Sequence, residues 1–94
     1  MSQKKFGKEV QEAFKNVTYL LENMIKDRAV PRNIKRIAQR GVNELQREDD
    51  SPAVLSSNVM YMMDDLTLDP NLPFHSRTTI YRILSILEKI KDVE

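Results

Sequence analysis

The amino-acid sequence contains two copies of one pattern, offset by 42 residues. Asp27-Arg28-Ala29-Val30-Pro31 returns as Asp69-Pro70-Asn71-Leu72-Pro73, so that both segments read Asp-x-x-aliphatic-Pro. The match extends upstream, where residues 16–22 align with residues 58–64 and both segments begin with Asn-Val-x-Tyr. It also extends downstream, where each of three residues meets a similar one, in the pairs Lys35 with Arg77, Arg40 with Arg82 and Leu45 with Leu87. A self-match at a fixed offset indicates one supersecondary unit that is used twice.

Each copy has the pattern of a helical hairpin. Apolar residues recur at spacings of three and four, which is typical of one face of an α-helix. The pattern predicts helices over about 4–26, from near Pro31 to about 47, from Pro52 to about 67, and from between Pro73 and Ser76 to about 91. The residue before a proline avoids the helical conformation, so each Asp-x-x-aliphatic-Pro segment must end one helix before the next begins.

The predicted fold is therefore all-α, a single domain over residues 1–94 in which two similar hairpins form a four-helix bundle. The first hairpin covers about 4–47 and the second about 52–91. No segment alternates polar and apolar residues between turn signals, as a strand would. Two repeats are too few for an open solenoid, so we expect them to close on each other. The alternative is that the pair keeps an apolar edge and dimerises.

The repeated turn residues Asp27, Pro31, Asp69 and Pro73 are interpreted as structural. Proline suits the start of a helix because its missing N–H would have no partner within the helix. Each carboxylate has two candidate roles. It can accept hydrogen bonds from backbone N–H groups of its own turn, or it can bridge to the basic residue eight positions on, Lys35 or Arg77.

Other positions predict packing. Gly41 in mid-helix costs about 1 kcal/mol relative to alanine, which predicts that another helix approaches closely there. Tyr19 and Tyr61 occupy matching repeat positions and are interpreted as boundary residues with buried rings and hydrated hydroxyls. Met60, Met62 and Met63 are interpreted as core residues, of which at least one is exposed.

Charge is unevenly distributed along the chain. Residues 26–47 carry seven basic residues against Asp27 and Glu44, whereas residues 48–70 carry six acids and no Lys or Arg. The basic residues of the second helix form a candidate face for phosphates or an acidic partner: Arg32, Lys35, Arg36, Arg40 and Arg47. In the opposing interpretation this is a solvated face that the acidic segment 48–69 partly neutralises.

No pattern in the sequence points to catalysis. The chain has no cysteine and one histidine, His75, so no nucleophile–base arrangement can be assembled and no cofactor is expected. The acidic clusters lack the spacing of calcium loops or di-metal bundles, so no metal site is expected. The absence of an 18-residue apolar run or a secretory signal predicts no membrane association and a cytoplasmic location.

The sequence thus predicts a protein that is not an enzyme. We expect a protein-interaction or structural module whose partner is another protein or a second copy of itself as a homodimer. The alternative is a nucleic-acid-associated protein that binds phosphates through the basic face of the second helix.

Three stretches resemble a known family: Val30-Pro31-Arg32-Asn33-Ile34-Lys35-Arg36, the turn at 69–78, and Ile83-Leu84-Ser85-Ile86-Leu87-Glu88. They are similar to small archaeal helical proteins catalogued as uncharacterised protein family 0147. The resemblance implies a four-helix bundle from a cytosolic archaeal protein, and it brings no established activity or functional residues. More loosely, residues 27–38 resemble the turn and second helix of HEAT-type hairpins.

Overall fold

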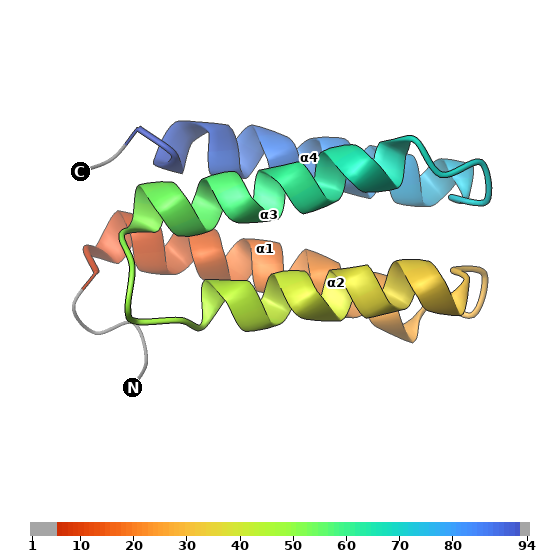
Figure 1. Cartoon of the computed structure of the whole chain (residues 1–94), viewed down its shortest axis with the longest axis horizontal. Helices are drawn as coiled ribbons and strands as arrows, with labels where there is room; N and C mark the ends of the chain where they lie inside the picture. The colour runs from red at the N-terminus through yellow and green to blue at the C-terminus, as the bar shows by residue number, and fades with distance from the viewer. Residues whose placement is uncertain (1–5, 93–94) are drawn as a thin grey trace.

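The structure, a computed structural model, describes residues 6–92, which form four α-helices. Their bounds are Lys8–Lys26 (α1), Arg32–Leu45 (α2), Pro52–Thr67 (α3) and Phe74–Ile90 (α4). Each helix packs against the next one along the chain, and α4 returns to pack against α1. The α1–α2 and α3–α4 turns lie together at one end of this antiparallel bundle, and the α2–α3 connection lies at the other (Figure 1). The predicted all-α four-helix bundle is confirmed.

Helix starts follow the local chemistry of the chain. Ser51 caps α3, because its Oγ accepts a hydrogen bond from the Val54 amide at 3.2 Å and Pro52 takes the first helical position, as expected. Pro31 and Pro73 do not take the first helical position. They lie one residue before it, at the N-cap positions of α2 and α4. Asn33 lies within the first turn of α2. Part of the segment expected to begin the first helix, residues 4–5, lies outside the described residues.

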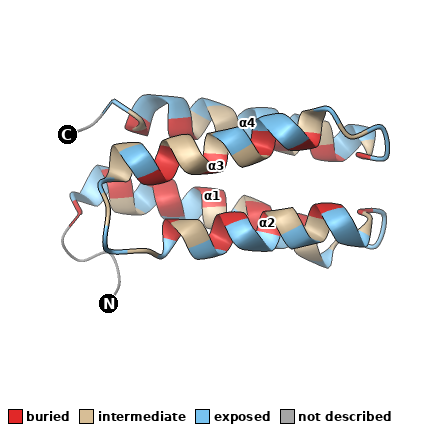
Figure 2. Cartoon of the chain, in the orientation of Figure 1, coloured by how far each residue is buried: buried red, intermediate tan, exposed pale blue. Residues whose placement is uncertain are grey.

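The apolar faces of all four helices meet in one core that runs the length of the bundle (Figure 2). Its fully buried side chains include Leu21, Ile34, Leu55 and Ile83, one from each helix. Burial of each such aliphatic side chain contributes about 1.5–3 kcal/mol, so the core is the main source of stability. Met63 is buried, while Met60 and Met62 are half-buried and pack against the core, so the expectation of an exposed methionine in this cluster was wrong.

Gly41 marks the point where α2 is crowded by two neighbours. A Cβ at this position would lie 3.2 Å from Leu21 Cδ1 of α1 and 3.7 Å from Val59 Cγ1 of α3. The predicted close approach of another helix is confirmed. At the equivalent position of the second hairpin the chain has Ile83, so the two hairpins are not packed identically.

The four helices are too short or too polar to span a lipid bilayer in the part of the chain that the structure describes.

Candidate functional site

The two repeated turns are held by their aspartates in the same way. Asp27 Oδ1 accepts a hydrogen bond from the Ala29 amide, and Asp69 Oδ1 accepts one from the Asn71 amide, both at 2.8 Å. Each carboxylate therefore satisfies a backbone donor within its own turn. Of the two roles considered for these residues, hydrogen bonding to the turn backbone is the one that the structure shows.

The second oxygen of each aspartate crosses to the other hairpin. Asp27 Oδ2 lies 2.6 Å from His75 Nε2 at the start of α4, and Asp69 Oδ2 accepts a hydrogen bond from Asn33 Nδ2 of α2 at 3.0 Å. Asn33 and His75 are themselves 42 residues apart, so the two contacts are related by the internal repeat. We call this reciprocal pair of contacts the turn clasp. It ties the two hairpins together at the end of the bundle that carries both turns.

The basic residues eight positions after the aspartates are not their ion-pair partners in the described part of the chain. Arg77 Nη1 instead donates to the carbonyl oxygen of Thr67 at 2.8 Å, at the C-terminal end of α3. The bridge considered from the sequence is therefore replaced by the turn clasp. The sequence contained an indication of the turn clasp, because two hydrogen-bonding side chains, Asn33 and His75, occur at equivalent repeat positions.

The turn clasp makes the ionisation of Asp27 sensitive to folding. The hydrogen bond from His75, and after it the hydrogen bond from the Ala29 amide, hold the pKa of the Asp27 carboxyl below its ordinary value of 3.8. A carboxyl whose pKa is lower in the folded protein stabilises the fold at pH values above its unfolded pKa. That contribution is lost as the pH falls through the lower, folded value.

We expect the wild-type protein to be more stable than an Asp27→Asn variant at neutral pH, with a difference that shrinks as the pH falls below 3.8. Denaturant unfolding followed by circular dichroism at a series of pH values measures this difference. Asp69→Asn is the matched control, because the cross-hairpin partner of Asp69 is the uncharged amide of Asn33. A difference for Asp27→Asn that stayed the same from neutral to acid pH would contradict the clasp's electrostatic role.

The basic face of α2 is only partly neutralised. Arg32, Arg36 and Arg40 are exposed and follow one another at four-residue spacing, on the side of α2 away from the core. Within residues 6–92 none of the three forms an ion pair with a carboxylate. Lys35 lies half-buried beside them. A polar contact from α2 to α3 is made by Glu44, which accepts a hydrogen bond from Asn58 Nδ2 at 2.6 Å.

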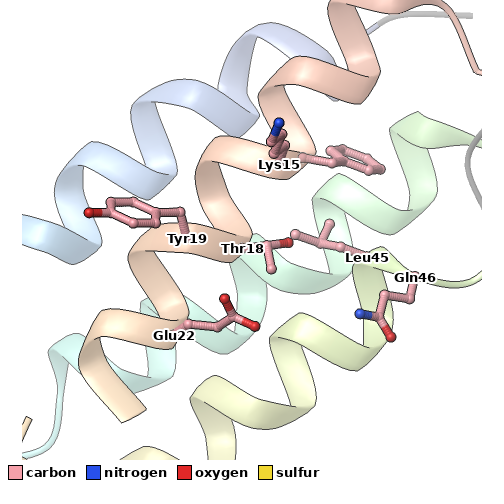
Figure 3. A pocket seen from close by; sticks show the side chains of 7 residues that line it. Lys15, Thr18, Tyr19, Glu22, Leu45 and Gln46 are labelled. Atoms are coloured by element: carbon pink, nitrogen blue, oxygen red, sulfur yellow. The ribbon is translucent and has the colours of Figure 1, made fainter. Parts of the chain in front are cut away.

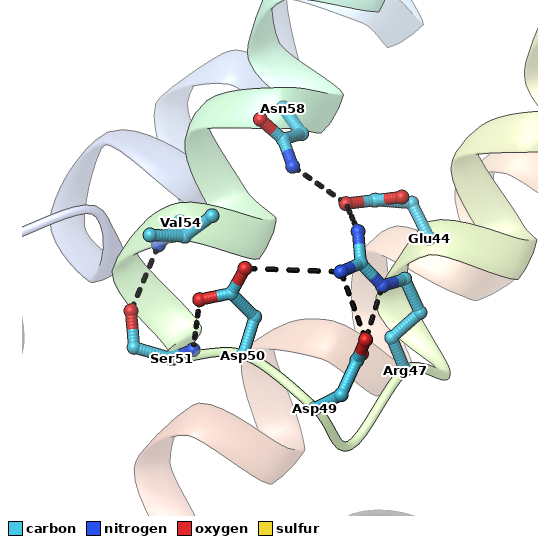
Figure 4. A network of polar contacts seen from close by, with 7 residues as sticks. All are labelled: Glu44, Arg47, Asp49, Asp50, Ser51, Val54 and Asn58. Carbon is cyan, nitrogen blue, oxygen red and sulfur yellow. Dashed lines mark hydrogen bonds and ion pairs between the residues drawn. The ribbon is translucent and has the colours of Figure 1, made fainter.

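Arg47 is the exception among the predicted basic residues. It lies beyond the end of α2, in the connection to α3, and not on the helical line of the other arginines. Its guanidinium pairs with Glu44 at 2.8 Å, Asp49 at 2.9 Å and Asp50 at 3.7 Å (Figure 4). These contacts raise the pKa of Arg47, chiefly through the hydrogen bond to Asp49. Arg47 thus fastens the α2–α3 connection, and within residues 6–92 it is the one member of the five that forms ion pairs with the acidic segment.

Large apolar side chains are exposed in two rows on the outside of the second hairpin. One row lies on α3 and at its C-terminal end, at seven-residue spacing, and consists of Val54, Tyr61 and Leu68. The other lies on α4 at the same spacing and consists of Phe74 and Tyr81. The exposed fractions are 71% for Tyr61, 81% for Leu68 and 84% for Phe74, values typical of polar side chains. We call these five residues the α3–α4 apolar face.

The first hairpin lacks such a face although its sequence pattern repeats in the second. The positions equivalent to the five residues of the α3–α4 apolar face are occupied by Glu12, Tyr19, Lys26, Arg32 and Gln39. Only Tyr19 among them is apolar in part, and it is 65% exposed. The expectation that the rings of Tyr19 and Tyr61 are buried was wrong, since both tyrosines lie on the outer sides of their helices.

A groove of about 340 Å³ lies between α1 and the C-terminal end of α2 (Figure 3). Lys15, Tyr19 and Glu22 line one side, and Leu45 and Gln46 line the other. A smaller hollow of about 160 Å³ lies beside Tyr61. Its lining includes Ser57, Tyr61 and Asp64, which are the repeat equivalents of Lys15, Tyr19 and Glu22. The two hollows are therefore a consequence of the repeated hairpin packing.

No group of three potential metal-ligating side chains occurs within residues 6–92.

The structure defines the class of protein to which the chain belongs: small four-helix bundles built from two repeated hairpins, with a turn clasp at one end. The chain is a member of the uncharacterised protein family UPF0147, whose model matches residues 1–90.

Relatives of this family occur in archaea. A UPF0147 protein of Saccharolobus islandicus is 41% identical over 78 residues, which cover 83% of this chain and 88% of the relative. One from Methanocaldococcus jannaschii is 37% identical over 81 residues, covering 86% and 87%. The crystal structure of a UPF0147 protein from Thermoplasma acidophilum is similar, with a TM-score of 0.82 at 36% identity over 89% of this chain and 99% of that one. The family is uncharacterised, so the function has to be argued from this chain.

Proposed function

We propose that the protein is a non-enzymatic interaction module of the cytoplasm that binds a protein partner through the α3–α4 apolar face. The difference between the two hairpins carries this proposal. Two hairpins that repeat one sequence pattern have similar needs for core residues, so packing alone does not explain why one of them carries five large apolar side chains at outer positions and the other only Tyr19. Exposed apolar clusters on small soluble proteins are typical of contact surfaces.

The residue types of the face support the same function. Aromatic side chains supply large contact areas at a low cost in conformational entropy, and they are enriched in protein interfaces. Three of the five residues are aromatic, namely Tyr61, Phe74 and Tyr81, and each is more than half exposed. Burying them against a partner would remove from water three of the four exposed aromatic side chains of the described residues.

Site-specific photo-crosslinking tests this function. A benzophenone amino acid replaces Tyr61 in one variant and its repeat equivalent Tyr19 in the other, and both are irradiated in native cell extract. We expect protein adducts from position 61 and few from position 19, because both sites are exposed tyrosines on outer helix faces but only one lies among apolar neighbours. Equal adduct formation at the two positions, or none at position 61, would contradict the proposal.

A second candidate function is nucleic-acid binding, which the unpaired arginines of α2 favour. Arg32, Arg36 and Arg40 present three guanidinium groups along one exposed line, without intramolecular carboxylate partners in the described residues. Such a line suits contacts with successive phosphates.

The salt dependence of binding tests this second candidate. Arg40→Ala is expected to weaken binding to DNA or RNA at low salt and to reduce the slope of log affinity against log salt by about one. Arg82→Ala is the matched control, because Arg82 is the exposed repeat equivalent of Arg40 on α4. Absence of binding at low salt, or equal losses in the two variants, would exclude this face as a phosphate site.

A further inference from the structure

We propose that the α3–α4 apolar face binds a second copy of this chain, with α3 of each copy packed on α4 of the other. The proposal rests on the proposed function and names its partner. It follows from two properties of the face, the register of its two rows and the distribution of charge between its two helices.

The two rows are in register with each other. Seven residues make two helical turns, so each row stays on one side of its helix, as in the seam of a coiled coil. Leu68 and Phe74 lie on either side of the α3–α4 turn, and Tyr61 and Tyr81 each lie seven residues from them. Leu68 and Phe74 are therefore the members of the two rows nearest the turn, and Tyr61 and Tyr81 are the next members along their helices.

A symmetric dimer can use such a face in two ways. When the two-fold axis is parallel to the helices, α3 of one copy packs on α4 of its partner. When the axis lies across the helices in the plane of the interface, α3 packs on the partner's α3 and α4 on the partner's α4. Both arrangements cover the same two rows, so the charged residues beside the rows decide between them.

The charges favour packing of α3 on α4. On α3 the exposed acids are Asp64 and Asp65, and the helix has no Lys or Arg. On α4 the basic residues Arg77, Arg82 and Lys89 outnumber the single acid Glu88. Packing α3 on α3 would bring together two helices that carry acids and no base, whereas packing α3 on α4 brings an acidic helix against a mainly basic one. Opposite charges across an interface favour association in one orientation, and like charges oppose the other.

In this arrangement Tyr61 packs against the partner's Tyr81, and Leu68 packs against the partner's Phe74. The aromatic pair at the centre of each contact can adopt the offset or edge-to-face geometry that such rings prefer. The third position of the α4 row is Glu88, so the apolar contact ends there and the interface becomes polar at its rim. The α1–α2 hairpins then lie on the outside of the dimer.

Sedimentation equilibrium from micromolar to near-millimolar protein tests the proposal. The wild-type chain is expected to dimerise, and Tyr61→Glu is expected to raise the dimer dissociation constant roughly 30-fold or more, because Tyr61 lies at the centre of the contact. Tyr19→Glu, at the equivalent exposed position of the first hairpin, should leave the constant unchanged. A wild-type chain that remains monomeric throughout this range overturns the proposal.

Cysteine crosslinking tests the orientation, since the native chain has no cysteine. A mixture of Tyr61→Cys and Tyr81→Cys chains is expected to give a mixed disulfide dimer on mild oxidation, whereas Tyr61→Cys alone should give little. Efficient self-crosslinking of Tyr61→Cys overturns the packing of α3 on α4. A monomeric wild type that still gives photo-adducts with other proteins at position 61 refutes the dimer and leaves the proposed function standing.

Discussion

A Leu21→Ala variant is expected to lose about 2–5 kcal/mol of unfolding free energy. Leu21 is 0% exposed, and its Cδ1 lies over the site where Gly41 lacks a side chain. Because the glycine has no Cβ to move into the vacated space, the cavity would stay open. Small domains are stable by only about 5–15 kcal/mol in total, so the loss would be a large share of the total.

Chemical denaturation followed by circular dichroism measures this loss. Tyr19→Ala provides the control on the same helix, because Tyr19 is 65% exposed and its truncation leaves no cavity. We expect a change within about 0.5 kcal/mol for the control. Similar losses of unfolding free energy for Leu21→Ala and Tyr19→Ala would mean that Leu21 does not fill the space between α1 and α2.

The helices and turns of this fold could be predicted from the sequence because they depend on local chemistry. Apolar spacing defines the buried faces, and Pro31, Pro52 and Pro73 define the helix starts to within a residue. The capping role of Asp27 and Asp69 is also local, since each carboxylate reaches an amide two residues on. Gly41 was informative for a different reason, because a glycine inside a helix needs a compensating contact.

The turn clasp could not be predicted from either hairpin alone. It depends on both turns lying at the same end of the bundle, which is a property of the whole topology. Once the two hairpins face each other, Asp27 meets the start of α4 and Asp69 meets the start of α2. The offset shared by Asn33 and His75 could have suggested the exchange, but only with this symmetry already in hand.

The exposure of the α2 arginines and of the tyrosines depends on the rotation of each helix about its axis. The acidic segment follows α2 in sequence, yet the α2 side chain turned toward α3 is Glu44 and not Arg36 or Arg40. Of the predicted basic residues, the acidic segment therefore pairs with Arg47, its neighbour in sequence, and not with these arginines in the described part of the chain. Tyr61 lies two residues from the buried Val59, and a two-residue step on a helix turns the side chain to the far side. The position of Tyr61 on the helix relative to Val59 can be read from the sequence, and it predicts that Tyr61 is exposed.

The second large effect is expected at the glycine itself. Replacing Gly41 with isoleucine, the residue at the equivalent position 83, should cost about 1–3 kcal/mol. A Cβ alone would already lie 3.2 Å from Leu21 Cδ1, and the further atoms of isoleucine would have to displace Leu21 or Val59, both fully buried. Any gain in helix propensity over glycine is below about 1 kcal/mol and does not offset this.

A double-mutant cycle shows whether the glycine exists to accommodate Leu21. In the Leu21→Ala/Gly41→Ile variant the new side chain can enter the space that Leu21 leaves, so the combined loss should be smaller than the two single losses together. The coupling is expected to be about 0.5–3 kcal/mol in the compensating direction, as found for residues in direct contact. The second hairpin already uses the other solution, with Ile83 on α4 and the more adaptable Met63 at the position equivalent to Leu21. If the losses of the two single variants simply added, the close approach of Val59 of α3, and not the contact with Leu21, would be the reason for a glycine at position 41.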